Sequence, residues 1–365
     1  MNRRQILLGG AALALAPSLG RAQALKPLKI GVMNDMSSVY SDFQGRGSVI
    51  AAQLAVEDYS AKLGVPVEIL AADHQNKPDV GVAIARKWFD EDGVDAVADL
   101  PNSGVGLAVN AVVRDKNRVL LGSGTSSLAY TNAQCSPNSV VWTFDTYMLS
   151  HSVAEGVVQA KGDRWFFLIA DYQFGKALAK ETGDLVRSLG GTVAGEARHP
   201  LNTSDFSSYL LQAQASKANV VAFANAGGDT INAIKQAAEF GLNAAGLRVV
   251  PLVLFITDVH SLGLQTAQGL TFSEAFYWDL NEETRAFSQR FRTRSKGHAP
   301  PTSVQAGVYS SVRHYLKALE ALGANPGDGA AVVAKMKALP VDDPLFGEGE
   351  IRADGRFVHP AYVFQ

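Results

Sequence analysis

The stretch LKIGVMN at residues 28–34 is a short apolar run of the kind that forms a buried strand. An amphipathic segment follows it at 46–61, and a β-rich run, VPVEILAAD, occupies 65–73. A helix is expected over 78–90, and the run VDAVADL at 94–100 starts the next repetition. Short strands that alternate with helices predict a parallel sheet covered by helices, so this part of the chain is an α/β unit.

The same rhythm continues and then restarts. A helix at 103–116 and RVLLGSG at 118–124 complete the first unit, which an irregular segment at 125–137 and an expected strand, VVWTFD at 140–145, follow. The elements expected in a second unit are the helices 147–161, 175–190, 205–217 and 228–241 and the strands 164–171, 192–198, 219–226 and 248–255. Residues 281–339 are mostly helical, and the runs DPLFGEGEIR and HPAYVF resemble short antiparallel strands. Two such units without a low-complexity linker predict two lobes joined by crossing strands.

Composition narrows the class of protein. The 365 residues are 47% hydrophobic and 19% charged, which is typical of a compact globular chain. The 33 basic and 35 acidic residues give a net charge of -2 without a run of like charges, which argues against a nucleic-acid partner. The single cysteine, Cys135, can form neither an intrachain disulfide nor, by itself, a thiolate metal cluster.

The first 24 residues have the pattern of an export signal. Arg3 and Arg4 form a basic start, an apolar stretch runs over 6–16, and Ala22-Gln23-Ala24 fits a cleavage site. The apolar stretch of about 11 residues is shorter than the roughly 20 that span a membrane. We therefore expect cleavage after Ala24 and a periplasmic protein, exported by a Sec or a twin-arginine signal.

Motifs for catalysis are missing from the sequence. It contains no phosphate-binding G-x-x-x-x-G-K-[ST], no metal-binding H-E-x-x-H and no G-x-S-x-G nucleophile turn. The seven histidines are scattered singly, and the pair Asp73-His74 has no strained nucleophile turn beside it. We expect neither an enzyme nor a cofactor or metal site.

Polar and aromatic residues recur on the loops that follow the expected strands, where open parallel sheets place their ligands. Ser103 is expected to cap a helix, whose free amides suit a carboxylate, and the Gly-Ser-Gly-Thr-Ser-Ser turn at 122–127 adds hydroxyls. The aromatic side chains either stack on a ligand or fill the cleft wall. The candidate ligand-binding residues are Phe43, Asn102, Ser103, Thr125, Ser126, Tyr172, Phe174, Asn225 and Asp258.

Five stretches in this order resemble the periplasmic solute-binding proteins of ABC importers, of the branched-chain amino acid-type (leucine-binding-like) family. They are KIGVMNDMS, the D-x-x-N-K-P segment at 73–78, LLGSGTSSLAYT, ADYQFGKAL and QGLTFSEAFYWDLNEETRAFSQRF. The resemblance implies a type I periplasmic binding protein fold, in which two Rossmann-like lobes are joined by a three-crossing hinge with a ligand cleft between them. Lobe I is expected to take residues 25–143 and 274–342, and lobe II residues 144–273 and 343–365.

The resemblance also assigns roles to residues. It places the ligand-carboxylate contacts on Ser103 and the Thr125-Ser126 turn, a lobe II contact on Phe174, and the acid that holds an amino acid's ammonium group on Asp258. Family members often have a disulfide between the loops after the second and third strands; this sequence has Gln75 or Asn76 and residues 100–102 there.

The resemblance implies a monomer that captures a small-molecule carboxylate and delivers it to the membrane permease subunits of an ABC importer. We expect an aromatic or hydroxy-aromatic acid, because the segment 276–281, FYWDLN, resembles that of family members with such ligands. The alternatives are a branched-chain or other amino acid as the ligand, or a periplasmic sensor module with the same body.

Overall fold

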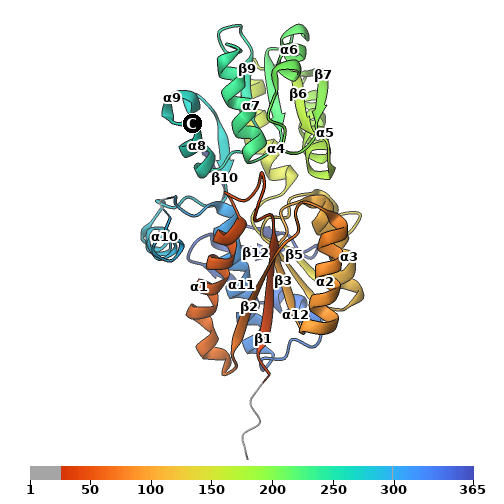
Figure 1. The fold of residues 1–365 in the computed structure, drawn as a ribbon, viewed down its shortest axis with the longest axis vertical. Helices are drawn as coiled ribbons and strands as arrows, with labels where there is room; N and C mark the ends of the chain where they lie inside the picture. Colours follow the sequence, from red (N-terminus) through yellow and green to blue (C-terminus); the bar gives the residue numbers. More distant parts are fainter. Residues whose placement is uncertain (1–25, 298) are drawn as a thin grey trace, which may run out of the picture.

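The structure, a computed structural model, describes residues 26–297 and 299–365, so the expected export signal lies outside it. Figure 1 shows two lobes stacked along the long axis of the molecule, with the N-terminal sheet in one lobe and the sheet of β6 to β9 in the other. We call these lobe I and lobe II. Among the described residues no helix has the length and apolar character needed to cross a membrane.

Lobe I contains a five-stranded parallel sheet in the order β2-β1-β3-β4-β5. Its strands are β1 (Leu28–Asn34), β2 (Val67–Asp73), β3 (Ala96–Asp99), β4 (Val119–Gly122) and β5 (Ser139–Val141). One face packs on α1 (Gly45–Leu63), α11 (Ser303–Ala321) and α12 (Gly329–Ala338), and the other on α2 (Pro78–Lys87), the π-helix η1 (Trp88–Asp92) and α3 (Ser103–Asp115). Since the strands are parallel, their carboxyl ends and following loops share one edge.

Lobe II contains a four-stranded parallel sheet in the order β7-β6-β8-β9. Its strands are β6 (Arg164–Ala170), β7 (Thr192–His199), β8 (Val220–Ala224) and β9 (Arg248–Pro251). One face packs on α4 (Thr146–Gln159) and α5 (Gln173–Ser188), and the other on α6 (Ser207–Ala215), α7 (Gly228–Glu239) and α8 (Ile256–Leu262), which α9 (Leu264–Ala267) follows. A Cβ at Gly175 would lie 2.2 Å from the Ala170 carbonyl oxygen, so only glycine lets α5 start this close to β6.

The chain passes between the lobes three times. It leaves lobe I after β5, returns between β10 (Phe272–Glu274) and α10 (Glu282–Ser295), and passes again between β13 (Phe357–Val358) and β14 (Tyr362–Phe364). β14 pairs antiparallel with β10, and Arg356 bridges to Val141 beside the first crossing. The crossings therefore support one another through main-chain pairing.

A buried ion pair lies at these crossings. Arg356 Nε donates to Asp145 Oδ2 over 3.0 Å, and its Nη1 donates to the Trp142 carbonyl oxygen over 2.8 Å. Both side chains are less than a tenth exposed. Asp145 also accepts a hydrogen bond from the Met148 N–H, which caps α4. The pair thus joins the third crossing to the first helix of lobe II.

Some expected boundaries differ from the structure. The expected strand 140–145 ends at Val141, and the expected strand 248–255 ends at Pro251, which lacks an N–H for further pairing. Of the short antiparallel strands near the C-terminus, β12 (Gly347–Ile351) lies in the expected run DPLFGEGEIR and β14 in the expected run HPAYVF, whereas β11 (Val341–Asp343) and β13 were not expected. We assigned 343–365 to lobe II, whereas side chains of this stretch lie in the lobe I core, namely Leu345, Phe346, Ile351 and Phe357. Their apolar faces pack on α11 and α12; the other lobe boundaries stay a prediction.

Candidate ligand-binding site

Aromatic side chains from both lobes meet where the loops at the carboxyl ends of the two sheets face each other. Phe43, from the loop after β1, stacks on Phe255, which precedes α8, with ring centroids 4.5 Å apart. Together with neighbouring residues they enclose a cavity of about 20 Å³. It is lined by Tyr40, Phe43, Pro101, Gly124, Ser126, Phe144, Tyr172, Phe174, Ala226, Val253 and Phe255. None of these lining residues carries a charge.

One hydrogen bond crosses this cavity from lobe to lobe. The hydroxyl oxygens of Tyr40 and Tyr172 lie 2.5 Å apart. Burial raises the pKa of both phenols, so both remain neutral at physiological pH and one donates to the other. The pair is therefore a polar contact inside an otherwise aromatic wall.

Asp35 shapes the loop that carries Tyr40 and Phe43. Its Oδ1 accepts the N–H of Ser38, and its Oδ2 accepts the N–H of Tyr40 over 3.0 Å and the amide of Asn76 over 2.8 Å. Burial pushes the pKa of Asp35 up, but hydrogen bonds from the Ser38 hydroxyl, the Tyr40 and Ser37 N–H groups and the Asn76 amide together outweigh burial and hold the pKa below its ordinary value. An ionised Asp35 thus fixes the loop that carries the aromatic side chains.

The N-terminus of α3 differs from the prediction in one residue. Asn102, not Ser103, caps the helix: its Oδ1 accepts the N–H groups of Gly104 and Val105 over 3.0 and 3.1 Å. Both residue types are good caps, so the sequence did not distinguish them. Ser103 is the first helical residue, and its buried hydroxyl has no hydrogen-bond partner among the described residues. Two amides that we expected to be free for an anion are therefore occupied.

Asn102 also joins two loops. Its Nδ2 donates to Asn76 Oδ1 over 3.2 Å, and Asn76 follows β2. These are the loops that the family resemblance implied to be joined by a disulfide in other members. Here a hydrogen bond between two amides makes the connection.

A second polar connection lies beneath the same loops. Asn34 Nδ2 donates to Asp99 Oδ2 over 2.8 Å and to the Gly45 carbonyl oxygen over 2.9 Å, and the Asp99 carbonyl oxygen accepts the N–H of Gly124 over 3.2 Å. Asp99 and Leu100 both have positive φ angles, 86° and 59°, which cost free energy in residues other than glycine. Asp99 thus links the loops after β1, β3 and β4 and stabilises a strained turn.

The turn after β4 presents Ser126 to the cavity but turns Thr125 inward. Thr125 is fully buried and its hydroxyl donates to the Gly122 carbonyl oxygen over 3.0 Å. A Cβ at Gly124 would lie 2.8 Å from Asp99 Oδ1, so this position needs glycine. Of the two predicted hydroxyls on this turn, only that of Ser126 belongs to a cavity-lining residue.

In lobe II the structure brings Tyr172 and Phe174 to the cavity, whereas Asn225 and Asp258 do not line it. Asn225 is buried and hydrogen-bonds His199 and Thr230. Asp258 is 1% exposed and its Oδ2 accepts the N–H of Phe255 over 2.9 Å, as part of a cap on α8. Burial raises the pKa of Asp258 to about 7. Both side chains serve the local fold in this conformation.

Three aromatic residues of the site were not predicted. Tyr40 lies inside a loop that was singled out for Phe43, while Phe144 and Phe255 fall in expected strands that end earlier in the structure. The signal that could have found them is their position: each lies within a few residues of a strand's carboxyl end, where this fold gathers its loops.

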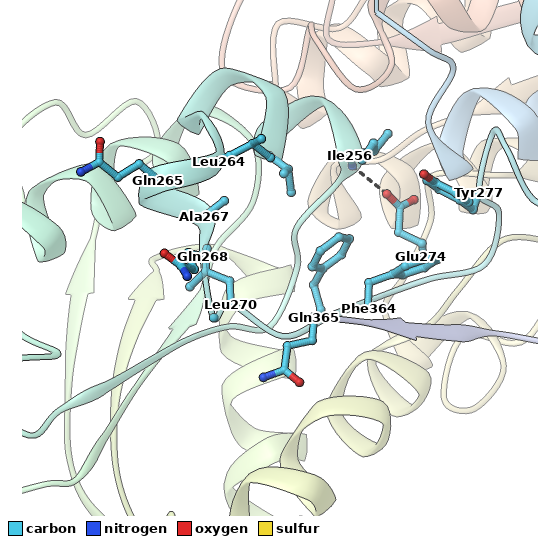
Figure 2. A pocket seen from close by; sticks show the side chains of 13 residues that line it. Ile256, Leu264, Gln265, Ala267, Gln268, Leu270, Glu274, Tyr277, Phe364 and Gln365 are labelled. Carbon is cyan, nitrogen blue, oxygen red and sulfur yellow. Dashed lines mark hydrogen bonds between the residues drawn. The ribbon is translucent and has the colours of Figure 1, made fainter.

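A larger cavity lies elsewhere. A hollow of about 740 Å³ opens on lobe II beside the second crossing, and Figure 2 shows the side chains around it. Its wall is mainly apolar and comes from α8, α9, β10 and β14, with Ile256, Leu264, Leu270, Phe272 and Phe364. The buried Glu274 lies at its edge next to Ile256. This hollow contains none of the predicted site residues.

The comparisons identify the class to which this architecture belongs. A family model described as "Periplasmic binding protein" matches residues 27–365, and the chain belongs to this family. Among curated proteins none matches at a significant level. The family places the protein in the periplasm.

Similar solved structures connect this family member to ABC transporters. A periplasmic binding protein from Burkholderia mallei is 44% identical, with 92% of this chain and 88% of that chain covered and a TM-score of 0.88. A branched-chain amino acid ABC transporter ligand-binding protein from Burkholderia xenovorans is 38% identical, with 92% and 89% covered and a TM-score of 0.79. A solute-binding protein from Rhodopseudomonas palustris in complex with benzoate shares the fold at 18% identity, with 93% and 92% covered and a TM-score of 0.83. The protein is a solute-binding protein of an ABC transporter, with a small-molecule ligand and permease partners.

Proposed function

We propose that the protein binds a small organic carboxylate, with an aromatic or hydroxy-aromatic acid preferred over a branched-chain amino acid, and delivers it to a permease. The observation that carries this proposal is the wall of the cavity between the lobes. Six aromatic rings line it, and aromatic faces pair well with a planar ring. Tyr40 and Tyr172 add hydroxyls that suit a ring substituent.

The carboxylate end of the ligand would be recognised by hydroxyls and main-chain amides of lobe I. Ser126 lines the cavity, and Ser103, whose hydroxyl has no partner among the described residues, is the first residue of α3, two positions after the cavity-lining Pro101. The dipole of α3 favours negative charge at its N-terminus, although Asn102 already occupies two of its amides. No cationic side chain is present among the cavity-lining residues, so the site would solvate the anion with neutral donors.

The amino-acid alternative needs a carboxylate for the ligand's ammonium group. Asp258, to which the family resemblance gives this role, accepts the Phe255 N–H, which leaves only its Oδ1 without a partner among the described residues. Its raised pKa of about 7 also means that the charged form is disfavoured there. This arrangement supports the aromatic acid over the amino acid.

Binding would require the lobes to separate. A cavity of about 20 Å³ holds about one water molecule, far less than a benzoate ring needs. A ligand that contacts both lobes would then favour a closed form in which the aromatic wall surrounds it. The Rhodopseudomonas palustris protein with benzoate supports this because the same fold accommodates an aromatic acid there.

Calorimetric titration with benzoate, 4-hydroxycinnamate and leucine tests the ligand class. We expect the aromatic acids to bind more tightly than leucine, and the variants Ser126→Ala and Phe174→Ala to weaken their binding at least fivefold. Ser208→Ala, which removes an exposed hydroxyl from α6, is the matched control and should leave the dissociation constant unchanged. Tight binding of leucine that Asp258→Asn abolishes would overturn the proposal in favour of an amino acid.

The sensor alternative has the same site and differs only in its partner. If the protein delivers its ligand to an importer, deletion of its gene should abolish uptake of the radiolabelled acid by whole cells. Unchanged uptake, together with a lost transcriptional response to the acid, would favour the sensor.

A further inference from the structure

A buried carboxyl joins the two lobes at the second crossing. Glu274 is the last residue of β10 and is 3% exposed. Its Oε1 accepts the N–H of Ile256 over 2.7 Å, the bond drawn in Figure 2, and its Oε2 bonds to the hydroxyl of Ser303 over 2.6 Å. Ile256 is the first residue of α8 in lobe II, and Ser303 is the first residue of α11 in lobe I. One side chain therefore holds a helix start from each lobe.

The same two helix starts position the stacked rings of the cleft. Thr302, next to Ser303, donates its hydroxyl to the Phe43 carbonyl oxygen over 2.6 Å. Phe255 immediately precedes Ile256, and its ring stacks on that of Phe43. These contacts form a continuous path that starts and ends at Glu274. The path runs through the start of α11 to Phe43, across the cleft to Phe255, and back through the start of α8.

On one side, the start of α8 borders an open space and not packed side chains. Ile256 and Val259 face the 740 Å³ hollow, which Glu274 also borders. Side chains in close packing would fix the helix on all sides, whereas here hydrogen bonds must set its place beside an open space. This makes the position of α8 depend on Glu274 more than a packed helix would.

Glu274 has no cationic partner within salt-bridge distance among the described residues. Burial, and to a smaller extent the neighbouring Asp258 on α8, raise its pKa to about 8, although the hydrogen bonds from Ser303 and Ile256 oppose this. At neutral pH the side chain is then mainly a carboxylic acid. A glutamine can keep a hydrogen bond to both partners, because its oxygen accepts from Ile256 and its amide donates to the Ser303 hydroxyl, which reverses the direction of that bond.

We propose that Glu274 is a positioning residue of the ligand site, which fixes the starts of α8 and α11 relative to each other and so sets the stacking of Phe255 on Phe43 across the cleft. The effect on binding rests on the proposed function. The effect on the arrangement of the lobes is independent of the proposed function, because Glu274 holds both helices in the absence of ligand.

The experiment compares Glu274→Gln, Glu274→Ala and Ser303→Ala in the full mature chain. The exposed Glu282→Ala at the start of α10 is the matched control. Spin labels on the native, exposed Cys135 of lobe I and on a Ser208→Cys substitution in lobe II report the distance between the lobes without ligand. Titration with benzoate reports binding.

We expect Glu274→Ala and Ser303→Ala to broaden the distance distribution at least twofold and to raise the dissociation constant for benzoate at least tenfold. Glu274→Gln and Glu282→Ala should match the native chain in both measurements. A positioning role requires this rescue by glutamine. If Glu274→Ala leaves the distance distribution unchanged, or if Glu274→Gln is as damaging as Glu274→Ala, the inference is wrong.

The two proposals fail in different ways. If the native chain binds none of the aromatic acids but the alanine variants still broaden the distances, the proposed ligand class fails and the role of Glu274 stands. If benzoate binds and no variant changes its affinity or the distances, the ligand class stands and Glu274 is not a positioning residue.

Discussion

The hydroxyl of Tyr40 in lobe I lies 2.5 Å from the hydroxyl of Tyr172 in lobe II. The two residues are 132 positions apart in the chain, and each comes from a loop at the carboxyl end of a strand. Tyr40 is 1% exposed, so in this conformation its hydroxyl depends on its partner from the other lobe. The closed arrangement of the lobes therefore includes a polar contact that an open arrangement would replace with water.

Replacing Tyr172 with phenylalanine should weaken closure. The change leaves the buried Tyr40 hydroxyl without its partner, which costs about 1–2 kcal/mol in the closed form only. Without ligand, we expect the ratio of closed to open molecules to fall roughly 5- to 30-fold, measured as the distance between spin labels on Cys135 and on a Ser208→Cys substitution. Tyr147→Phe on α4, where the ring is 55% exposed, is the control and should have no effect. Equal distance distributions for the native protein and Tyr172→Phe would show that the contact does not contribute to closure.

The ion pair at the crossings should be important for stability. Arg356→Met leaves the buried Asp145 carboxylate without its cation, and breaking a buried pair costs about 3 kcal/mol or more. Arg352→Met removes a pair with Asp354 in which the arginine is 49% exposed, and the cost should stay below about 1 kcal/mol. Urea unfolding monitored by circular dichroism gives both values. Similar losses for the two variants would contradict the assignment.

Asp99 should make stability depend on pH. Burial raises its pKa from 3.8 to about 6, against the hydrogen bond from Asn34. The folded chain therefore holds this proton more tightly than the unfolded chain, so its contribution to stability is greatest below pH 3.8 and is lost as the pH rises to about 6.

The variant Asp99→Asn keeps an acceptor for Asn34 but cannot titrate. Relative to this variant, the native chain should lose about 2 kcal/mol of unfolding free energy between pH 4 and pH 7. Chemical unfolding at a series of pH values measures the difference. Parallel curves for the two proteins would show that Asp99 does not titrate in this range.

The export signal can be tested on protein recovered from the periplasm. The basic start, the apolar stretch and Ala22-Gln23-Ala24 predict cleavage after Ala24. N-terminal sequencing should read Leu25-Lys26-Pro27. Full-length protein that stays in the cytoplasm would contradict the prediction.

The two-lobed α/β fold could be predicted from the sequence because its strands and helices produce a local periodicity of apolar residues. The β-rich runs near 28–34 and 164–171 and the helices between them are visible as patterns of apolar residues, and the structure has strands and helices there. The ends of several elements differ from the prediction, and α8, α9, β10 and β13 were not predicted. The expected strand 248–255 is apolar throughout, and its pattern does not show that Phe255 caps a helix instead.

The site was harder to predict because its contacts join distant parts of the chain. The loops could be found, since they follow strands, and four of the nine predicted residues line the cavity: Phe43, Ser126, Tyr172 and Phe174. Whether a polar side chain faces a ligand or its own backbone depends on geometry that residue type does not determine. Asn102 and Asp258 both bond to helix amides, and a sequence offers no means of telling this from ligand binding.

The path of the chain between the lobes has a consequence for how the protein folds. Lobe II is inserted into lobe I, because β1 to β5 precede it and α10 to β13 follow it. One face of the lobe I sheet is therefore only partly covered, by α1, until α11 and α12 pack on it, while the sheet of lobe II has its helices close by in sequence. Contacts between distant segments form slowly. Refolding should thus occur in two phases, with lobe II ordered first and ligand binding recovered only in the slower phase.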